Sequence, residues 1–176
     1  MMKLNKVKIV FCDIDGTLLE MGKTEITPNM RKALCSLKQN GIKICIATGR
    51  SFATIPMFEG VVFDAILAFN GSFCTVGEQV VAKCPIPKED VKKIIENAKR
   101  MERPVSIATA EEIVANGSDK DLEDYFAIAH HRVNVSEKFE EYVDKDVFQI
   151  MLGCDLEERK YILKGTKNAK LAAWWD

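Results

Sequence analysis

Residues 7–17 read Val-Lys-Ile-Val-Phe-Cys-Asp-Ile-Asp-Gly-Thr, an apolar run that ends in two aspartates and a glycine. The run over 7–12 is rich in β-branched residues and predicts a short strand of a parallel sheet, buried on both faces. Side chains alternate along an extended chain, so Asp13 and Asp15 fall on the same side of it. They follow the carboxyl end of the strand, where open α/β sheets bind their ligands.

Two more apolar runs, 42–47 and 65–69, predict further parallel strands. Between the first two strands, Thr27 can cap a helix, Pro28 fits its first position and Gly41 follows its end. Strand, helix and strand in this order form a βαβ unit, so the sequence predicts an α/β fold with a parallel sheet.

The pattern changes after Asn70. Residues 72–76 and 79–84 predict a hairpin that closes a first domain over 1–84, and 85–176 are expected to form a separate α+β domain. A helix is expected over 88–101, with one apolar face of Val91, Ile94, Ile95, Ala98 and Met101. Further helices are expected over 51–57, from Ser118 to His131 and from a capping box at Asp155 and Glu158 to Leu163. Strands are expected over 104–109, 147–152 and 170–175.

Composition narrows the class of protein. The 176 residues are 47% apolar and carry 25 Lys and Arg against 26 Asp and Glu, a net charge of −1. Because no basic excess exists to neutralise phosphates, nucleic acid is not an expected partner. No apolar run approaches the roughly 20 residues that cross a bilayer. Six cysteines without a CxxC pair, together with a charged N-terminus, indicate a reduced, cytoplasmic protein.

The paired carboxylates of Asp13 and Asp15 indicate a reactive site. Two such groups side by side need a compensating cation, and Mg²⁺ is the natural hard cation for oxygen ligands. One carboxylate can then act as nucleophile and the other as general acid/base. Gly16 is expected to turn the chain and to offer its N–H to an anion. The alternative, a simple turn that ends a strand, is less favoured beside the glycine and threonine that follow.

Four other residues at strand ends are candidates for binding substrate. Thr48 and the N–H of Gly49 can hold phosphate oxygens, and Arg50 can pair with a substrate anion. Asn70, after the third strand, can orient the nucleophile or the substrate. The alternatives stay open, since Arg50 fits a solvated strand-to-helix turn equally well and Asn-Gly is first of all a turn signal.

These motifs resemble a known group. The segments FCDIDGTLL (11–19), IATGR (46–50) and AFNGS (68–72) are similar to those of the haloacid dehalogenase (HAD) superfamily, specifically its Cof-like, type IIB capped sugar phosphatases. The resemblance implies a Rossmann-like core, with 85–176 as a mobile cap that selects the substrate. It also implies that Asp13 is the phosphorylated nucleophile, Asp15 the general acid/base and Thr48 a phosphate ligand, with Mg²⁺ held by Asp13 and the Asp15 backbone carbonyl.

The chain departs from this family in one respect. The third-motif lysine and the fourth-motif acidic pair are not found, since no Gly-Asp dipeptide occurs. The sequence is therefore expected to be truncated within the cap, with part of the metal site missing, and the isolated 1–176 chain is expected to be at most feebly active. The first strand would then remain as an apolar, unpaired edge through which the chain self-associates.

The expected function is that of a Mg²⁺-dependent phosphatase of small phosphorylated metabolites, with sugar phosphates as the foremost class. A phosphomutase with the same aspartyl-phosphate chemistry is one alternative. A non-catalytic fragment that binds a metabolite or a metal is another. A receiver domain is disfavoured, because it needs its acidic pair and its phosphoacceptor on different strands.

Overall fold

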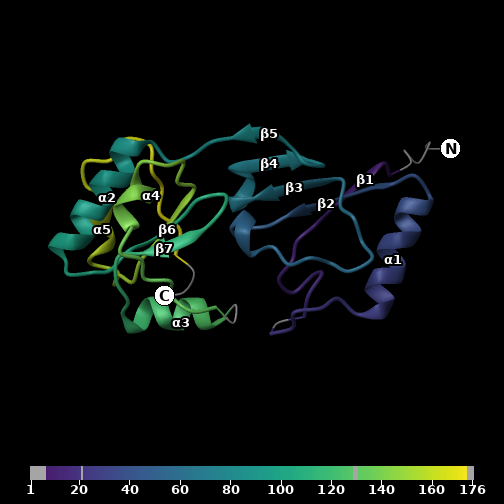
Figure 1. Ribbon diagram of the computed structural model, residues 1–176, viewed down its shortest axis with the longest axis horizontal. Helices are drawn as coiled ribbons and strands as arrows, with labels where there is room; N and C mark the ends of the chain where they lie inside the picture. Colours follow the sequence, from purple (N-terminus) through teal and green to yellow (C-terminus); the bar gives the residue numbers. More distant parts are fainter. Residues whose placement is uncertain (1–6, 21, 129–130, 174–176) are drawn as a thin grey trace. The chain divides into compact units, whose positions relative to one another are not determined.

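The computed structural model describes residues 7–20, 22–128 and 131–173 (Figure 1). The chain divides into two compact units, Met1–Lys83 and Cys84–Asp176, which we call the N-terminal and the C-terminal unit. In the described part of the chain, no helix has the length and apolar character that a membrane crossing requires.

The N-terminal unit is built on a sheet of five strands in the order β1-β2-β3-β4-β5. The strands β1 (Ile9–Cys12), β2 (Lys43–Ala47) and β3 (Ala65–Ala68) are parallel, which confirms the expected α/β fold. The strands β4 (Phe73–Val76) and β5 (Gln79–Lys83) continue it as an antiparallel hairpin. The carboxyl ends of the three parallel strands therefore lie at one edge of the sheet.

Helix α1 (Pro28–Gln39) connects β1 to β2 and begins where the sequence predicts. Thr27 caps it, because its side-chain oxygen accepts the N–H of Met30 at 3.2 Å. Leu34 turns inward and packs with Ile44 and Ile46 of β2, and all three side chains are at most 2% exposed. This core fixes one face of β2 and so positions its carboxyl end.

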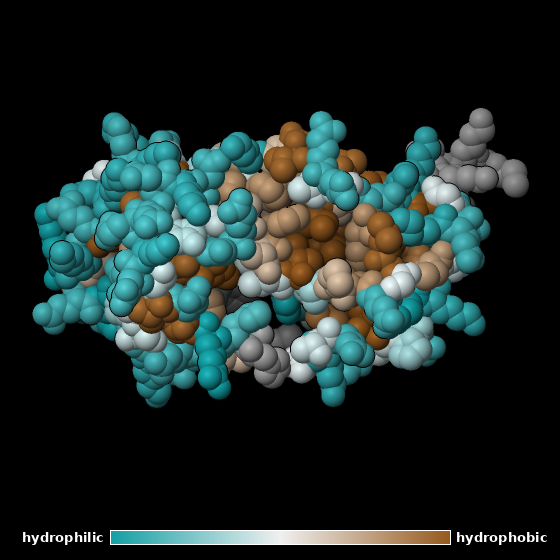
Figure 2. All heavy atoms as spheres, in the orientation of Figure 1, coloured by the Kyte–Doolittle hydropathy of each residue, from teal (hydrophilic) through white to brown (hydrophobic). Residues whose placement is uncertain are grey.

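The strand β1 differs from the expectation of burial on both faces. Ile9 and Phe11 are 45% and 52% exposed, because α1 and the core cover only the face that carries Cys12. Among the described strands, β1 pairs with β2 alone, so it is the apolar edge that the sequence leads us to expect. Figure 2 shows exposed apolar side chains over the sheet of this unit.

The prediction of a helix over 51–57 is wrong in its length. Only a short 3₁₀ turn, η1 (Phe52–Thr54), forms between β2 and β3. Ile55 is extended, as is typical of a residue before proline, and this ends the turn.

The C-terminal unit has a three-stranded antiparallel sheet in the order β7-β6-β8. Val91, Ile94 and Ala98 of helix α2 are buried, which confirms the predicted apolar face. The elements of this unit are α2 (Lys88–Arg100), β6 (Ser106–Ala108), β7 (Ile113–Ala115), α3 (Lys120–Ile128), α4 (Phe139–Val143), β8 (Gln149–Met151) and α5 (Arg159–Ile162).

Helix α3 begins and ends differently from the prediction. The N–H of Leu122 is accepted by Asp119 at 2.9 Å, so Asp119 and not Ser118 provides the cap. The Ser118 hydroxyl donates instead to Glu123. The described part of the helix runs to Ile128, residues 129–130 lie outside the described residues, and the predicted end at His131 is not helical.

Other predictions for the C-terminal unit have mixed outcomes. Asp155 and Glu158 form the predicted capping box, in which each side chain accepts the backbone N–H of the other at 2.8 and 2.9 Å. The strand β7 and the helix α4 were not predicted. The strand expected over 170–175 is absent from 170–173, and 174–175 lie outside the described residues.

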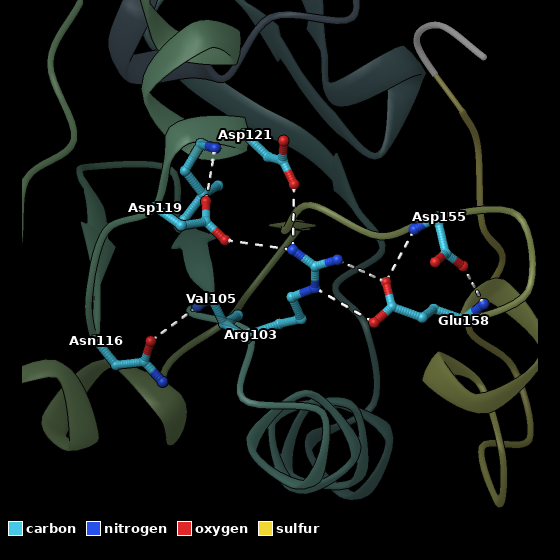
Figure 3. A network of polar contacts seen from close by, with 8 residues as sticks. Arg103, Val105, Asn116, Asp119, Asp121, Asp155 and Glu158 are labelled. Atoms are coloured by element: carbon cyan, nitrogen blue, oxygen red, sulfur yellow. Dashed lines mark hydrogen bonds and ion pairs between the residues drawn. The ribbon is translucent and has the colours of Figure 1, made fainter.

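A polar network holds the turn between α2 and β6 (Figure 3). Arg103 forms an ion pair with Glu158 at 2.9 Å and contacts Asp121 at 3.3 Å and Asp119 at 4.0 Å. Because Glu158 also belongs to the capping box, Arg103 ties the start of α3 to the turn before α5.

Candidate active site

A cleft of about 310 Å³ lies at the carboxyl ends of the parallel strands. Asp13 follows β1, Thr48 and Gly49 follow β2, and Asn70 follows β3, and all four line this cleft. The remaining lining residues are Ala47, Leu67 and Gly71. The structure thus brings together four candidate residues from three segments that are far apart in sequence.

The loop after β1 is held by its own backbone and by three buried side chains. Ile14, Leu18 and Leu19 are at most 3% exposed, whereas Asp13 and Asp15, which flank Ile14, are exposed. The N–H groups of Leu18 and Leu19 donate to the carbonyls of Asp13 and Ile14 at 3.2 and 2.8 Å. The apolar side chains therefore anchor a tight turn that presents both carboxylates to solvent.

Gly16 turns the chain as predicted, but its N–H is not the free donor that was expected. Its N–H donates to the Leu19 carbonyl at 2.8 Å, so this group is not free to bind an anion. Its φ of +78° lies in the left-handed region, which glycine adopts without strain. Gly16 therefore serves the turn and not the ligand.

Asp15 is bound by Arg50 through two hydrogen bonds. Arg50 Nε donates to Asp15 Oδ2 at 2.8 Å, and Nη2 donates to Oδ1 at 2.6 Å. The hydrogen bond with Asp15 raises the pKa of Arg50, burial opposes this, and the charges of Asp15 and Asp13 reinforce it. Neither Asp15 nor Arg50 lines the cleft, and the predicted pairing of Arg50 with a substrate anion is replaced here by a pairing within the protein.

Thr48 is buried, with 5% of its surface exposed, and its backbone is fixed by β3 through the Leu67 carbonyl at 2.9 Å. Its hydroxyl oxygen accepts the N–H of Arg50 at 3.2 Å. No described residue accepts the hydroxyl proton, which therefore remains available to a ligand oxygen in the cleft.

Asn70 enters the cleft from a strained backbone. Phe69 and Asn70 are consecutive non-glycine residues with φ of 50° and 54°, a left-handed conformation that L-residues rarely adopt. Two hydrogen bonds hold it, from Phe69 N–H to the Arg50 carbonyl at 2.9 Å and from Asn70 N–H to the Thr48 carbonyl at 3.0 Å. Strain stored in this way is typical of functional sites, and it gives no signal in the sequence beyond Asn-Gly itself.

The residues present can supply a magnesium ion with two protein ligands, one carboxylate and one backbone carbonyl. The Asp13 carboxylate is exposed and accepts no hydrogen bond from any described residue, so it is free to ligate. Both oxygens of the Asp15 side chain are bound by Arg50, so the predicted metal role of Asp15 is restricted to its backbone carbonyl. The described residues contain no group of three or more His, Cys, Asp or Glu suited to a metal. Mg²⁺ suits such a site, because it binds through one or two carboxylates and completes its shell with waters and substrate phosphate.

Comparisons with known proteins identify the family of the chain. The sequence model of the haloacid dehalogenase-like hydrolase family matches residues 10–173, which confirms the predicted resemblance. The chain is 30% identical over 156 residues to the Bacillus subtilis (strain 168) protein named "Putative phosphatase YkrA".

Two solved structures share the fold. The HAD subclass IIB sugar phosphatase BT4131 is 27% identical with a TM-score of 0.76, over 96% of this chain and 67% of that one. The phosphatase-superfamily protein BT1666 from Bacteroides thetaiotaomicron is 27% identical with a TM-score of 0.77, over 91% of this chain and 60% of that one. The match to YkrA covers 87% of this chain and 60% of YkrA, so the chain spans less than two thirds of that relative's length.

Proposed function

The chain belongs to the haloacid dehalogenase-like hydrolases, and on this premise we propose that it carries the nucleophile half of a Mg²⁺-dependent phosphatase site. The observation that carries the proposal is the position of Asp13. Its unpaired, exposed carboxylate follows β1 and shares one cleft with the Thr48 hydroxyl at the end of the neighbouring strand. The proposal is supported because the parallel strands bring the candidate nucleophile and the candidate phosphate ligand to one edge of the sheet.

The proposed reaction transfers the phosphoryl group twice. An Asp13 oxygen forms a bond to phosphorus while the bond from phosphorus to the leaving oxygen breaks, and Asp15 gives that oxygen its proton. Water then attacks phosphorus, Asp15 takes up the proton, and cleavage of the bond to Asp13 releases inorganic phosphate. Thr48 donates its hydroxyl proton to a phosphate oxygen in both steps, and Asn70 helps to orient the group.

The proposed magnesium ligands are the Asp13 carboxylate and the Asp15 backbone carbonyl. When bound there, Mg²⁺ would supply positive charge against the negative charge of the phosphoryl group. Transition states of this reaction are stabilised mainly by positioning and by charge neutralisation.

The proposed substrates are small phosphorylated metabolites, with sugar phosphates as the foremost class. Support comes from BT4131, which is a sugar phosphatase with 27% identity to this chain. We propose further that the C-terminal unit is the cap that selects among these substrates. The two alternative functions, a phosphomutase and a non-catalytic fragment, are not favoured by any contact in the cleft.

The experiment is hydrolysis of p-nitrophenyl phosphate by the purified chain with and without Mg²⁺. We expect weak Mg²⁺-dependent phosphate release, because this chain carries only the nucleophile half of the site. Asp13→Asn should abolish it, because the amide is isosteric but not nucleophilic. Glu20→Gln is the matched control, since Glu20 is an exposed acid of the same loop outside the cleft. No release by the unmodified chain would favour the non-catalytic fragment, and equal release by Asp13→Asn would overturn the assignment of the nucleophile.

A further inference from the structure

We infer that Arg50 is a positioning residue that holds the Asp15 carboxylate in one orientation, and not a ligand of the substrate anion. The inference rests on the proposed function for its catalytic meaning, but the geometry that carries it is independent of any activity. It concerns two residues that are 35 positions apart in sequence and are joined by two hydrogen bonds.

Arg50 is held in place by contacts other than the one with Asp15. Its backbone N–H donates to Thr48 Oγ1 at 3.2 Å, and its carbonyl accepts the N–H of Phe69 at 2.9 Å. Nη1 of its side chain donates to the Thr54 carbonyl at 3.3 Å. The side chain is 20% exposed, so its head group is held within the unit and does not extend into solvent.

Asp15, in contrast, has no other support for its side chain. It is 43% exposed, and among the described residues only Arg50 donates hydrogen bonds to its carboxylate. The planar guanidinium matches both carboxylate oxygens at once, which fixes the plane as well as the position of the carboxylate. Removal of Arg50 therefore leaves Asp15 free to sample other rotamers.

The same geometry argues against a substrate role for Arg50. Its Nε and Nη2 bind Asp15 together and its Nη1 donates to the Thr54 carbonyl, so the Nε–Nη2 edge of the guanidinium, which would bind an anion bidentately, is already in use. The positive charge of Arg50 is also neutralised by the carboxylate of Asp15. A group that must present one oxygen to a leaving group gains from such a clamp, because small displacements of catalytic groups cost about 100-fold in rate.

A matched control exists on the same unit. Arg31 forms an ion pair with Glu59 at 3.6 Å, and the Glu59 side chain is 91% exposed. Arg31→Ala removes the same charge and the same kind of pair, at a position outside the cleft.

The test measures the side-chain rotamer of Asp15 by NMR, from the couplings of its β-protons, in the chain and in Arg50→Ala, Arg50→Lys and Arg31→Ala. We expect one fixed rotamer in the unmodified chain and in Arg31→Ala, and rotamer averaging in both Arg50 variants, because lysine restores the charge but not the fork. Arg50→Lys keeps the test decisive if Arg50→Ala does not fold. A fixed Asp15 rotamer in a folded Arg50 variant would overturn the inference.

A kinetic readout separates positioning from substrate binding. With p-nitrophenyl phosphate, we expect Arg50→Lys to lower kcat by about 100-fold with little change in KM. A raised KM with kcat retained would assign Arg50 to the substrate and overturn the inference. If the unmodified chain hydrolyses nothing, the proposed function fails, while the rotamer measurement still decides the role of Arg50.

Discussion

Asn70 packs so closely on Gly49 that a β-carbon at Gly49 would lie 3.2 Å from Asn70 Oδ1. Gly49 belongs to the turn after β2, and Asn70 reaches the cleft from the strained turn after β3. The absence of a side chain at Gly49 is therefore what lets the ends of two neighbouring strands share one cleft.

Gly49→Ala should displace the Asn70 side chain by a few tenths of an ångström. We expect a loss of about 1 kcal/mol in the free energy of unfolding, the lower end for overpacking, and reduced kcat/KM on p-nitrophenyl phosphate. Urea denaturation and steady-state kinetics measure the two effects. The double variant Gly49→Ala/Asn70→Ala relieves the contact. Its loss in the free energy of unfolding should therefore be smaller than the sum of the losses in the two single variants. Losses that add strictly would contradict the contact.

Truncation of the core beneath the site should be costly. Ile44 is completely buried between the sheet and α1, and Ile44→Ala is expected to lower the free energy of unfolding by about 2–5 kcal/mol. Val81→Ala on β5 is the control, because Val81 is 54% exposed and should change stability by less than about 0.5 kcal/mol. Similar losses at both positions would show that the core is misassigned.

Asp90 should make the stability of the C-terminal unit depend on pH. Its carboxylate accepts the N–H groups of Lys167, Asn168 and Ala169 at 3.0, 2.8 and 3.0 Å. The hydrogen bond from Asn168, followed by that from Lys167, lowers the pKa of Asp90 in the folded state. Its stabilisation is therefore complete above the unfolded pKa and is lost as pH falls through the lower folded pKa.

Thermal unfolding of the chain and of Asp90→Asn checks this expectation. The variant should melt at lower temperature near neutral pH, and the gap in Tm should close as the pH falls. A gap that is the same at every pH would show that the carboxylate charge contributes nothing.

Arg103 should stabilise the C-terminal unit more than a surface ion pair does. Its side chain is 28% exposed and faces Glu158, Asp121 and Asp119, so Arg103→Gln leaves three carboxylates without their cation. We expect a loss of about 1–2 kcal/mol, between the values for exposed and buried pairs. Urea denaturation measures this loss. Arg100→Gln is the control, because Arg100 also pairs with a carboxylate, that of Glu96, but its side chain is 66% exposed. Equal losses would contradict a special role for Arg103.

The sequence predicted those parts of the fold that depend on residues close to one another along the chain. The Thr27 cap of α1 and the capping box of Asp155 and Glu158 depend on residues three positions apart, and both form as predicted. The α2 face was predicted because periodicity reports burial directly. The strand β7 was missed because three residues carry too little periodicity, and α4 because five residues complete barely more than one turn.

The details of the site depend on contacts between distant segments, which the sequence does not display. Strand-end placement gave reason to expect Asp13, Thr48 and Asn70 at one edge, since parallel pairing alone puts them there. The fork of Arg50 on Asp15 and the use of the Gly16 N–H by Leu19 depend on the folded turn. The exposure of Phe11 depends on which face α1 covers, and the residues of β1 itself do not encode that choice.

The most direct test of the central claim is to trap the phosphoryl group on Asp13. The Asp15→Asn variant is mixed with p-nitrophenyl phosphate and Mg²⁺, quenched in acid, digested and analysed by mass spectrometry. Since Asp15→Asn slows hydrolysis of the intermediate, we expect one phosphoryl group on Asp13, and none when Asp13→Asn is added. A phosphoryl group on another residue, or phosphate release by Asp13→Asn at the rate of the unmodified chain, would contradict the account.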